Sequence, residues 1–231
     1  MPRKPRFYLP NVPAHVMQRG HNRSAVFFEN EDYLEYLRIL KSMAEKYQCL
    51  IHAYVLMTNH VHLLLTPLSQ NSTSLFFQGL GRQYVTYINK TYGLSGSLWE
   101  GRHKGNSIDT EVYFLTCMRY IELNPVRANM CVDPGEYRWS SYAANALGEP
   151  NSILKPHAEY CRLGRNSALQ QEIYHGLFKE ILDVKIMSDL RQGVQSGTPV
   201  GGNNFTRKIE QLLNCKTGYI VRGRPKKPVL D

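Results

Sequence analysis

Residues 49–66 read CLIHAYVLMTNHVHLLLT, and this stretch decides the fold class. Two runs rich in β-forming residues flank the turn pair Thr58-Asn59, and this pattern predicts a β-hairpin. Side chains alternate along a strand, so His60 and His62 share one face of the second strand. Val61, Leu63 and Leu65 form the other face, which we expect to pack against helices.

The segments around this hairpin predict five further elements. Apolar residues recur at spacings of three and four between residues 32 and 47, which indicates an amphipathic helix. The full order is strand–helix–strand–strand–helix–strand–helix, and it predicts an α+β, ferredoxin-like (βαββαβ) antiparallel sheet with helices on one face. The seventh element, a helix, would dock at that sheet. The expected strands are 15–19, 49–57, 60–66 and 107–109, and the expected helices are 32–47, 72–92 with Ser72 as its cap, and 111–124.

The chain changes character after Tyr142. A linker-like stretch is followed by a long helical pattern, a Gly-rich break, a short amphipathic helix and a basic tail. We therefore predict two parts, a domain over 1–147 and a helical C-terminal extension over 148–231. The four segments of the extension are 148–156, 167–195, 197–204 and 205–213, and the tail carries Arg222, Arg224, Lys226 and Lys227.

Composition favours a polyanionic partner. The 231 residues include 28 Lys+Arg and 19 Asp+Glu, which gives a formal charge of +9 and a pI near 9.3. Nucleic acid is the first expectation and an anionic membrane surface the second, while a basic enzyme without such a partner is the plain alternative. Five scattered cysteines without a C-x-x-C spacing, and the lack of a signal peptide or a long apolar run, predict a cytoplasmic protein that does not enter a membrane.

Two pairs of residues suggest chemistry. His60 and His62 stand about 6.6 Å apart at their roots on one strand face, close enough to converge on one metal ion. Tyr120 and Asn124 are separated by four, so they lie on the same face of the predicted helix. Each residue also has an ordinary structural explanation: partly buried histidines, a packing tyrosine, and an asparagine that caps a following helix begun by Pro125.

Five separated motifs follow one another along the chain: RGHNR (19–23), HAYVLMTNHVHLLL (52–65), LWEGR (98–102), YIELNPVRA (120–128) and YRWSS (137–141). Their order resembles that of the IS200-like single-tyrosine HUH transposases. Asn124 four residues after Tyr120, with Pro-Val-Arg-Ala next, resembles the REP-associated tyrosine transposases (RAYTs) within that superfamily. The resemblance covers about residues 10–142.

The resemblance implies a reaction and a substrate. Tyr120 would be the nucleophile, and His60, His62 and Asn124 would hold a divalent metal, Mg²⁺ or Mn²⁺. Attack by Tyr120 on a phosphodiester would give a 5′-phosphotyrosine link and a free 3′-hydroxyl, and a second 3′-hydroxyl could reverse the step. The expected substrate is single-stranded or hairpin DNA of the REP palindrome type.

Basic residues are the expected DNA contacts, since phosphates dominate the affinity of DNA-binding proteins. The sequence around Gly223 also resembles an AT-hook, although a solubilising terminus explains the same composition. The candidates are Arg19, Arg23, Arg82, Arg102, Lys104, Arg127, Arg222, Arg224, Lys226 and Lys227.

Three rival functions stay open at this point. A hairpin-binding regulatory protein would keep the fold without activity, and a replication initiator or relaxase would use a different tyrosine context. An RNA-binding module on the same sheet would need aromatic residues on its central strands, where this chain has histidines. The sequence leaves the choice between monomer and dimer undetermined.

Overall fold

In the computed structural model, residues 8–213 are described, and four antiparallel strands within them form one sheet in the order β2-β3-β1-β4. Chain order alternates these strands with two long helices, α1 and α2, which gives βαββαβ. The predicted α+β, ferredoxin-like class is therefore confirmed. The bounds are β1 (Ala14–Arg19), α1 (Asn30–Lys46), β2 (Cys49–Met57), β3 (His60–Pro67), α2 (Ser72–Tyr92) and β4 (Lys104–Ser107).

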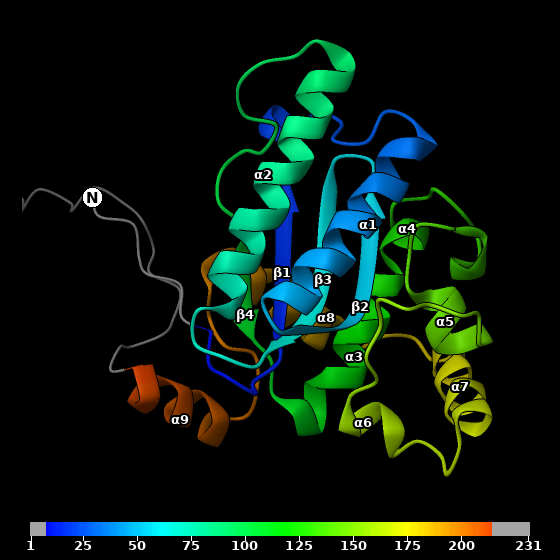
Figure 1. Cartoon of the computed structure of the whole chain (residues 1–231). Coiled ribbons are helices and arrows are strands. Elements are labelled where there is room, and N and C mark those ends of the chain that lie inside the picture. The colour runs from blue at the N-terminus through cyan, green and yellow to red at the C-terminus, as the bar shows by residue number, and fades with distance from the viewer. Residues whose placement is uncertain (1–7, 214–231) are drawn as a thin grey trace, which may run out of the picture.

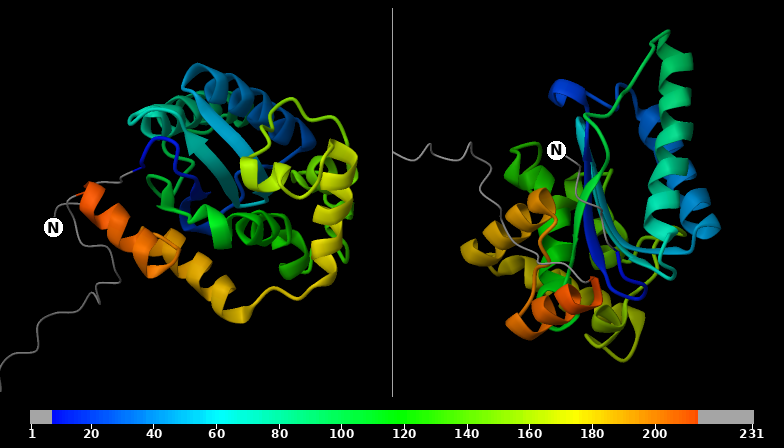
Figure 2. Two further views of the ribbon diagram at one scale, coloured as in Figure 1. Left: turned by 90° about the horizontal axis from the view of Figure 1, so that it is seen from below. Right: turned by 90° about the vertical axis from the view of Figure 1, so that its left-hand side faces the viewer.

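Helices α1 and α2 cover one face of the sheet (Figure 1 and Figure 2). The aliphatic side of β3 faces them: Val61, Leu63 and Leu65 are all fully buried in the same core cluster as Phe76 of α2. This burial is the physical consequence of the period-two pattern, because burying a large apolar side chain contributes about 1.5–3 kcal/mol. The histidine side of β3 therefore has to face the other way.

The opposite face of the sheet is covered by α3 (Thr110–Glu122) and α8 (Val184–Ser196), as the side view in Figure 2 shows. Helix α3 packs on β2 and β3, and α8 packs on β4 and β1. The short helix α4 (Asn124–Arg127) follows α3 directly, with a proline in its first turn. The α3/α8 face of the sheet is the one that carries His60 and His62.

The outer edge of β2 is covered by the YRWSS motif. The Leu56 N–H donates to the Trp139 carbonyl at 2.9 Å, and the Ser141 N–H donates to the Tyr54 carbonyl at 2.9 Å. The Tyr137 hydroxyl adds a bond to the Leu56 carbonyl at 2.7 Å. Because an open strand edge is a template for unwanted pairing, this segment protects the sheet while it fixes the chain that follows α4.

The rest of the chain wraps around the α3 side of the sheet and returns to β4. The predicted single helical stretch over 167–195 is wrong, because the chain forms two helices separated by residues 177–183. After α8, Val200 pairs with Ile108 in a parallel bridge beside the end of β4. The elements are η1 (His21–Arg23), η2 (Pro134–Glu136), α5 (Tyr142–Leu147), α6 (Ala158–Cys161), α7 (Ser167–Gly176), η3 (Leu177–Lys179), α8 and α9 (Asn203–Leu213).

Two local expectations differ from the structure. The last strand lies at 104–107 and not at 107–109, because its backbone pairs with β1 from Lys104 onward. Ser72 is the first residue of α2 and not its cap, and its hydroxyl accepts from the Ser69 N–H at 3.2 Å.

No helix in the described range 8–213 is long and apolar enough to span a bilayer. The division at 147/148 stays a prediction, and the basic tail at 222–227 lies outside the described residues.

Candidate active site

His60 and His62 lie side by side on the α3/α8 face of β3. Their ring centroids are 5.2 Å apart with the ring planes at 81°. Across the β1–β3 pairing, Arg19 stands opposite His60 and Met17 stands opposite His62. The His62 ring is buried, whereas His60, nearer the strand start, is partly exposed. Exposure of the pair therefore increases toward the first residue of β3.

Hydrogen bonds hold both rings through their Nδ1 atoms. His60 Nδ1 lies 2.6 Å from Asn59 Oδ1, which can only accept, so the His60 ring carries its hydrogen on Nδ1. The Asn59 amide is itself fixed, since its Nδ2 donates to the Arg23 carbonyl at 2.9 Å. His62 Nδ1 lies 2.8 Å from Nε2 of His15, a buried residue of β1. The Nε2 atoms of His60 and His62 are therefore the ring nitrogens left for a ligand.

Burial keeps these imidazoles neutral. Desolvation lowers the pKa of His60 to about 4, with a smaller contribution from the nearby Arg19 charge. The pKa of His62 is lowered well below its usual value, first by burial and then by the neighbouring His15, His60 and Arg127. Burial also lowers the pKa of His15 to about 3. Neutral imidazole is the form that binds metal ions, so the electrostatics suit metal ligation.

Tyr120 comes from α3 and its side chain is buried against the histidines. Its ring stands edge-on to the His62 ring at 6.2 Å and to the His15 ring at 5.7 Å between centroids. The Arg127 guanidinium lies over the Tyr120 ring, 4.7 Å from its centroid, a geometry that favours a cation near the ring face. The tyrosine is thus placed between a pair of possible metal ligands and a positive charge.

Asn124 stands one helical turn beyond Tyr120, where α3 gives way to α4. Its Nδ2 donates to the carbonyl of Tyr120 at 2.8 Å and to that of Ile121 at 3.2 Å. These bonds satisfy carbonyls that the end of α3 leaves free, so part of the role of Asn124 is to cap this helix. They also turn its Oδ1 away from those carbonyls, which makes Oδ1 the atom available to a metal.

A buried carboxyl group, that of Glu122, anchors the end of α3. Glu122 Oε1 accepts from Ser141 Oγ at 2.5 Å and from Asn145 Nδ2 at 2.8 Å, and its Oε2 accepts from the Tyr174 hydroxyl at 2.8 Å. Burial raises the pKa of Glu122 to about 7, although the three donors oppose this rise. The carboxyl ties α3 to the YRWSS motif and to the C-terminal helices, and so fixes the helix that carries Tyr120.

The chemistry of the donors fits a divalent cation. An amide oxygen is a ligand that Mn²⁺ and Mg²⁺ accept, and two imidazole nitrogens would also accept zinc. Within residues 8–213 there is no cluster of three His, Cys, Asp or Glu side chains suited to a metal, so a third protein ligand beside the two histidines would be of another type. An amide oxygen such as Asn124 Oδ1 meets that requirement.

Comparison with known proteins identifies the family. A model of the IS200-like transposases matches residues 9–124, half of the chain. This chain belongs to the IS200-like transposase family. The match includes both histidines, Tyr120 and Asn124, and it confirms the resemblance that the motifs predicted.

One solved structure shares the fold of this transposase. A REP-associated tyrosine transposase bound to a REP hairpin matches with a TM-score of 0.55 at 16% identity, over 68% of this chain and 99% of that one. A Deinococcus radiodurans R1 protein assigned as a transposase gives a TM-score of 0.37 at 19% identity, over 55% and 92%. No curated protein sequence matches the chain. The first likeness establishes the fold of the transposase.

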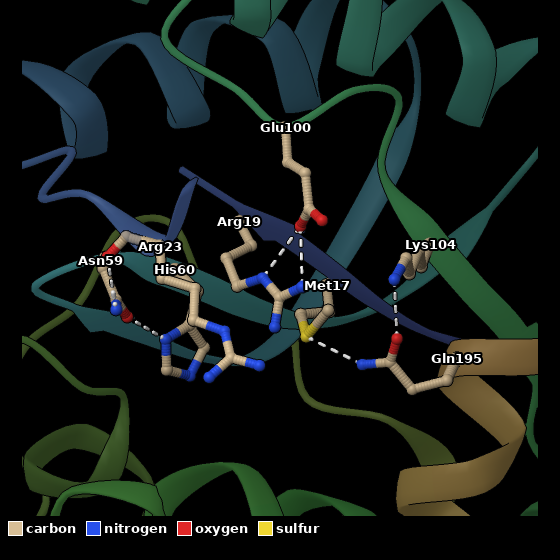
Figure 3. A network of polar contacts seen from close by, with 8 residues as sticks. All are labelled: Met17, Arg19, Arg23, Asn59, His60, Glu100, Lys104 and Gln195. Carbon is tan, nitrogen blue, oxygen red and sulfur yellow. Dashed lines mark hydrogen bonds and ion pairs between the residues drawn. The ribbon is translucent and has the colours of Figure 1, made fainter. Parts of the chain in front are cut away.

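The RGHNR and LWEGR motifs of the transposase pair with each other beside the histidines. The Glu100 N–H donates to the Arg19 carbonyl at 2.9 Å, and the Arg19 guanidinium donates two hydrogen bonds to Glu100 Oε2 at 2.7 and 2.9 Å. Gly20 bridges to Trp99 and sits so close to the Ser24 carbonyl that a Cβ would not fit. Figure 3 shows Arg19, Arg23 and His60 together on this side of the sheet.

The other predicted DNA contacts divide into two groups. Three of them are exposed on the side of the histidines. Arg23 follows β1 and Arg102 precedes β4, while Arg127 lies over the Tyr120 ring. Lys104 contacts α8, because its Nζ donates a hydrogen bond to Oε1 of Gln195 at 2.7 Å (Figure 3). Arg82, by contrast, is exposed on α2, on the opposite side of the sheet from the histidines.

The sequence-based predictions assigned no role to three residues that shape this site. His15 could be placed on the same strand face as Arg19 from alternation, but its contact with His62 depends on the pairing of β1 with β3. Asn59 was visible only as half of a turn pair. The sequence did hold a signal for Glu122. An acidic residue two positions after the tyrosine, with apolar neighbours on both sides, indicates a buried carboxyl group.

Proposed function

We propose that this transposase is a metal-dependent single-stranded DNA endonuclease and strand transferase that acts on REP-type hairpins through a 5′-phosphotyrosine intermediate. The observation that carries the proposal is the placement of the Tyr120 ring edge-on to His62, on the face where two Nε2 atoms are free. Family membership supports DNA transposition chemistry in general. The substrate class follows the fold shared with a relative that was solved with a REP hairpin.

The chain's own residues supply the parts of the reaction. Mg²⁺ or Mn²⁺ bound by His60, His62 and Asn124 would polarise the scissile phosphate as a Lewis acid. Tyr120 Oη forms the new bond to phosphorus, loses its proton, and the phosphorus–O3′ bond breaks to leave a 3′-hydroxyl. The Arg127 guanidinium over the Tyr120 ring favours the negative charge that develops on the phenol oxygen. Because one phosphodiester replaces another, a different 3′-hydroxyl can reverse the step and complete strand transfer.

DNA would approach the open side of the histidine face. Arg19, Arg23, Arg102 and Arg127 lie around that side, and they would bind phosphates in a salt-dependent way. Arg82 would contact DNA only where a hairpin reaches around to α2. The tail residues Arg222, Arg224, Lys226 and Lys227 stay candidates for a minor-groove arm. We also propose a cytoplasmic location, because five scattered cysteines without a C-x-x-C spacing suit a reducing compartment.

The test mixes purified protein with 5′- and 3′-labelled single-stranded hairpin oligonucleotides, with and without Mn²⁺. Denaturing gels then score cleavage and covalent adduct for the wild type and for Tyr120→Phe. Tyr113→Phe is a matched control, because Tyr113 is a half-buried tyrosine two turns earlier in the same helix, where it lines a pocket with Asp189 and Gln192 of α8. We expect a Mn²⁺-dependent adduct that Tyr120→Phe abolishes and Tyr113→Phe keeps.

The rival proposal is that the protein binds hairpin DNA as a regulatory protein and has no catalytic activity. Tight hairpin binding without an adduct under Mn²⁺ or Mg²⁺ would favour this rival and overturn the proposed chemistry. An adduct that survives Tyr120→Phe would instead reject Tyr120 as the nucleophile.

A further inference from the structure

His15 is a buried polar residue in direct contact with the histidine face. It is fully buried as the second residue of β1, and its Nε2 lies 2.8 Å from Nδ1 of His62. The two rings are stacked, with centroids 5.0 Å apart and planes at 24°. A buried polar group costs free energy unless it has a partner, so a histidine at this position calls for a physical reason.

The hydrogen bond between the two rings contains one hydrogen, which is carried either by His62 or by His15. The ring that carries it decides whether Nε2 of His62 can bind a metal ion. In one arrangement His62 donates from Nδ1 and keeps a lone pair on Nε2. In the other, His15 donates from Nε2, so the hydrogen of a neutral His62 sits on Nε2 and blocks that atom. Only the first arrangement lets His62 bind a metal through Nε2.

We propose that His15 is a positioning residue of the metal site: its Nε2 accepts the Nδ1 hydrogen of His62, and it thereby presents the Nε2 lone pair of His62 to the ion. This inference rests on the metal site of the proposed function. It gives His62 the same kind of support that the Asn59 amide oxygen gives His60. Hydrogen bonds to the second nitrogen of a metal-bound histidine fix both the tautomer and the ring orientation.

The surroundings of the second His15 nitrogen favour this arrangement. If Nε2 of His15 accepts, its hydrogen is on Nδ1, and Nδ1 then needs an acceptor. Asn106 of β4 stands directly opposite His15 in the β1–β4 register, and its Oδ1 is buried without a hydrogen-bond partner, as is His15 Nδ1. Directly opposed side chains have Cβ atoms about 4.5–5.5 Å apart, so a small rotation would join the two groups. An amide oxygen complements an N–H and not a bare ring nitrogen.

The first test reads the tautomer in the metal-free protein. Long-range ¹H–¹⁵N correlation spectra of histidine-labelled protein separate protonated from unprotonated ring nitrogens, and loss of signals in His62→Gln assigns the His62 ring. We expect a protonated Nδ1 and an unprotonated Nε2 on His62. A His62 ring protonated on Nε2 would overturn the proposal without any reference to DNA cleavage.

The second test measures Mn²⁺ affinity from the electron paramagnetic resonance signal of the free ion. His15→Phe keeps a ring of similar size and removes the acceptor, and we expect it to raise the Kd for Mn²⁺ about 10–100-fold. His15→Gln restores an acceptor at the position of Nε2 and should recover most of the affinity. His52→Gln is the matched control, because His52 is buried on β2 and bonds to Thr66 and to the Lys155 carbonyl, away from the site.

The outcomes separate this inference from the proposed function. Wild-type affinity in a folded His15→Phe protein would overturn the role of His15 and leave the metal site intact. A wild-type protein that binds no Mn²⁺ would overturn both. If His15→Phe does not fold, the tautomer of the wild type and the affinity of His15→Gln still decide the question.

Discussion

The buried carboxyl of Glu122 makes the stability of this transposase depend on pH in an unusual direction. Burial raises its pKa from 4.5 to about 7 in the folded protein, while the unfolded chain retains the ordinary value. Between these two values the folded protein holds a proton that the unfolded chain has lost. The free energy of unfolding therefore falls as pH rises through this window, and the contribution is fully present only below about pH 4.5.

The size of the effect follows from the shift. A difference of about 2.5 pKa units corresponds to about 3 kcal/mol of stability lost between about pH 4.5 and pH 8, at 1.36 kcal/mol for each unit. Glu122→Gln removes the ionisation and keeps an oxygen that can accept from Ser141 and Asn145. The difference between wild type and Glu122→Gln isolates this group, because all other ionisable groups are common to both proteins.

The assay is urea denaturation of both proteins at pH 5, 6, 7 and 8. We expect the wild type to lose stability relative to Glu122→Gln by about 2.5 kcal/mol across this series, because part of the loss already occurs below pH 5. Glu111→Gln is the control, since Glu111 is exposed on the first turn of the same helix and its variant should show little pH-dependent difference. A wild-type-minus-Glu122→Gln difference that stays constant within about 1 kcal/mol would refute the reasoning and show that the three donors hold the carboxylate ionised.

Three further predictions concern contacts around the site. Tyr137→Phe loses the 2.7 Å bond to the Leu56 carbonyl and should lower the free energy of unfolding by about 1 kcal/mol in urea titrations, and an unchanged midpoint would exclude an anchoring role. Glu100→Gln releases Arg19 and should tighten hairpin binding in fluorescence anisotropy while the melting temperature barely changes, because the Glu100 side chain is 46% exposed and its ion pair is screened by water. Arg127→Met should reduce the slope of log affinity against log salt by about 1, and an unchanged slope would remove Arg127 from the phosphate contacts.

Much of the fold followed from local patterns. The β2–β3 hairpin was predictable because its two strands are adjacent in the chain and a two-residue turn fixes their register. The order of elements was also predictable, since each helix or strand has its own periodicity. The path of the chain after α7 was not predictable from the sequence. Residues 177–183 interrupt a helical pattern through contacts with α3, including a hydrogen bond from Arg119 to the Glu180 carbonyl. Such contacts leave no periodic signal.

The candidate site shows the same division. His60 and His62 share a face by strand alternation, and Tyr120 and Asn124 share a face by helical spacing, so both pairs were predictable. The structure decided how the pairs meet, with the Tyr120 ring edge-on to His62. It also separated Arg82 from the other basic candidates, because α2 covers the sheet face opposite the histidines.

By itself, the sequence determined the family, the α+β class and the residues whose chemistry suits a metal and a nucleophile. Those conclusions depend on residue type and on spacings of two and four, which are properties of the local chain. Only the tertiary structure decided that His15 meets His62, that Arg19 meets Glu100, and that Glu122 is enclosed by residues 19 to 52 positions further along the chain. These contacts arise from strand register and helix packing, where the free energy depends on how distant segments bury each other and not on any one segment's pattern.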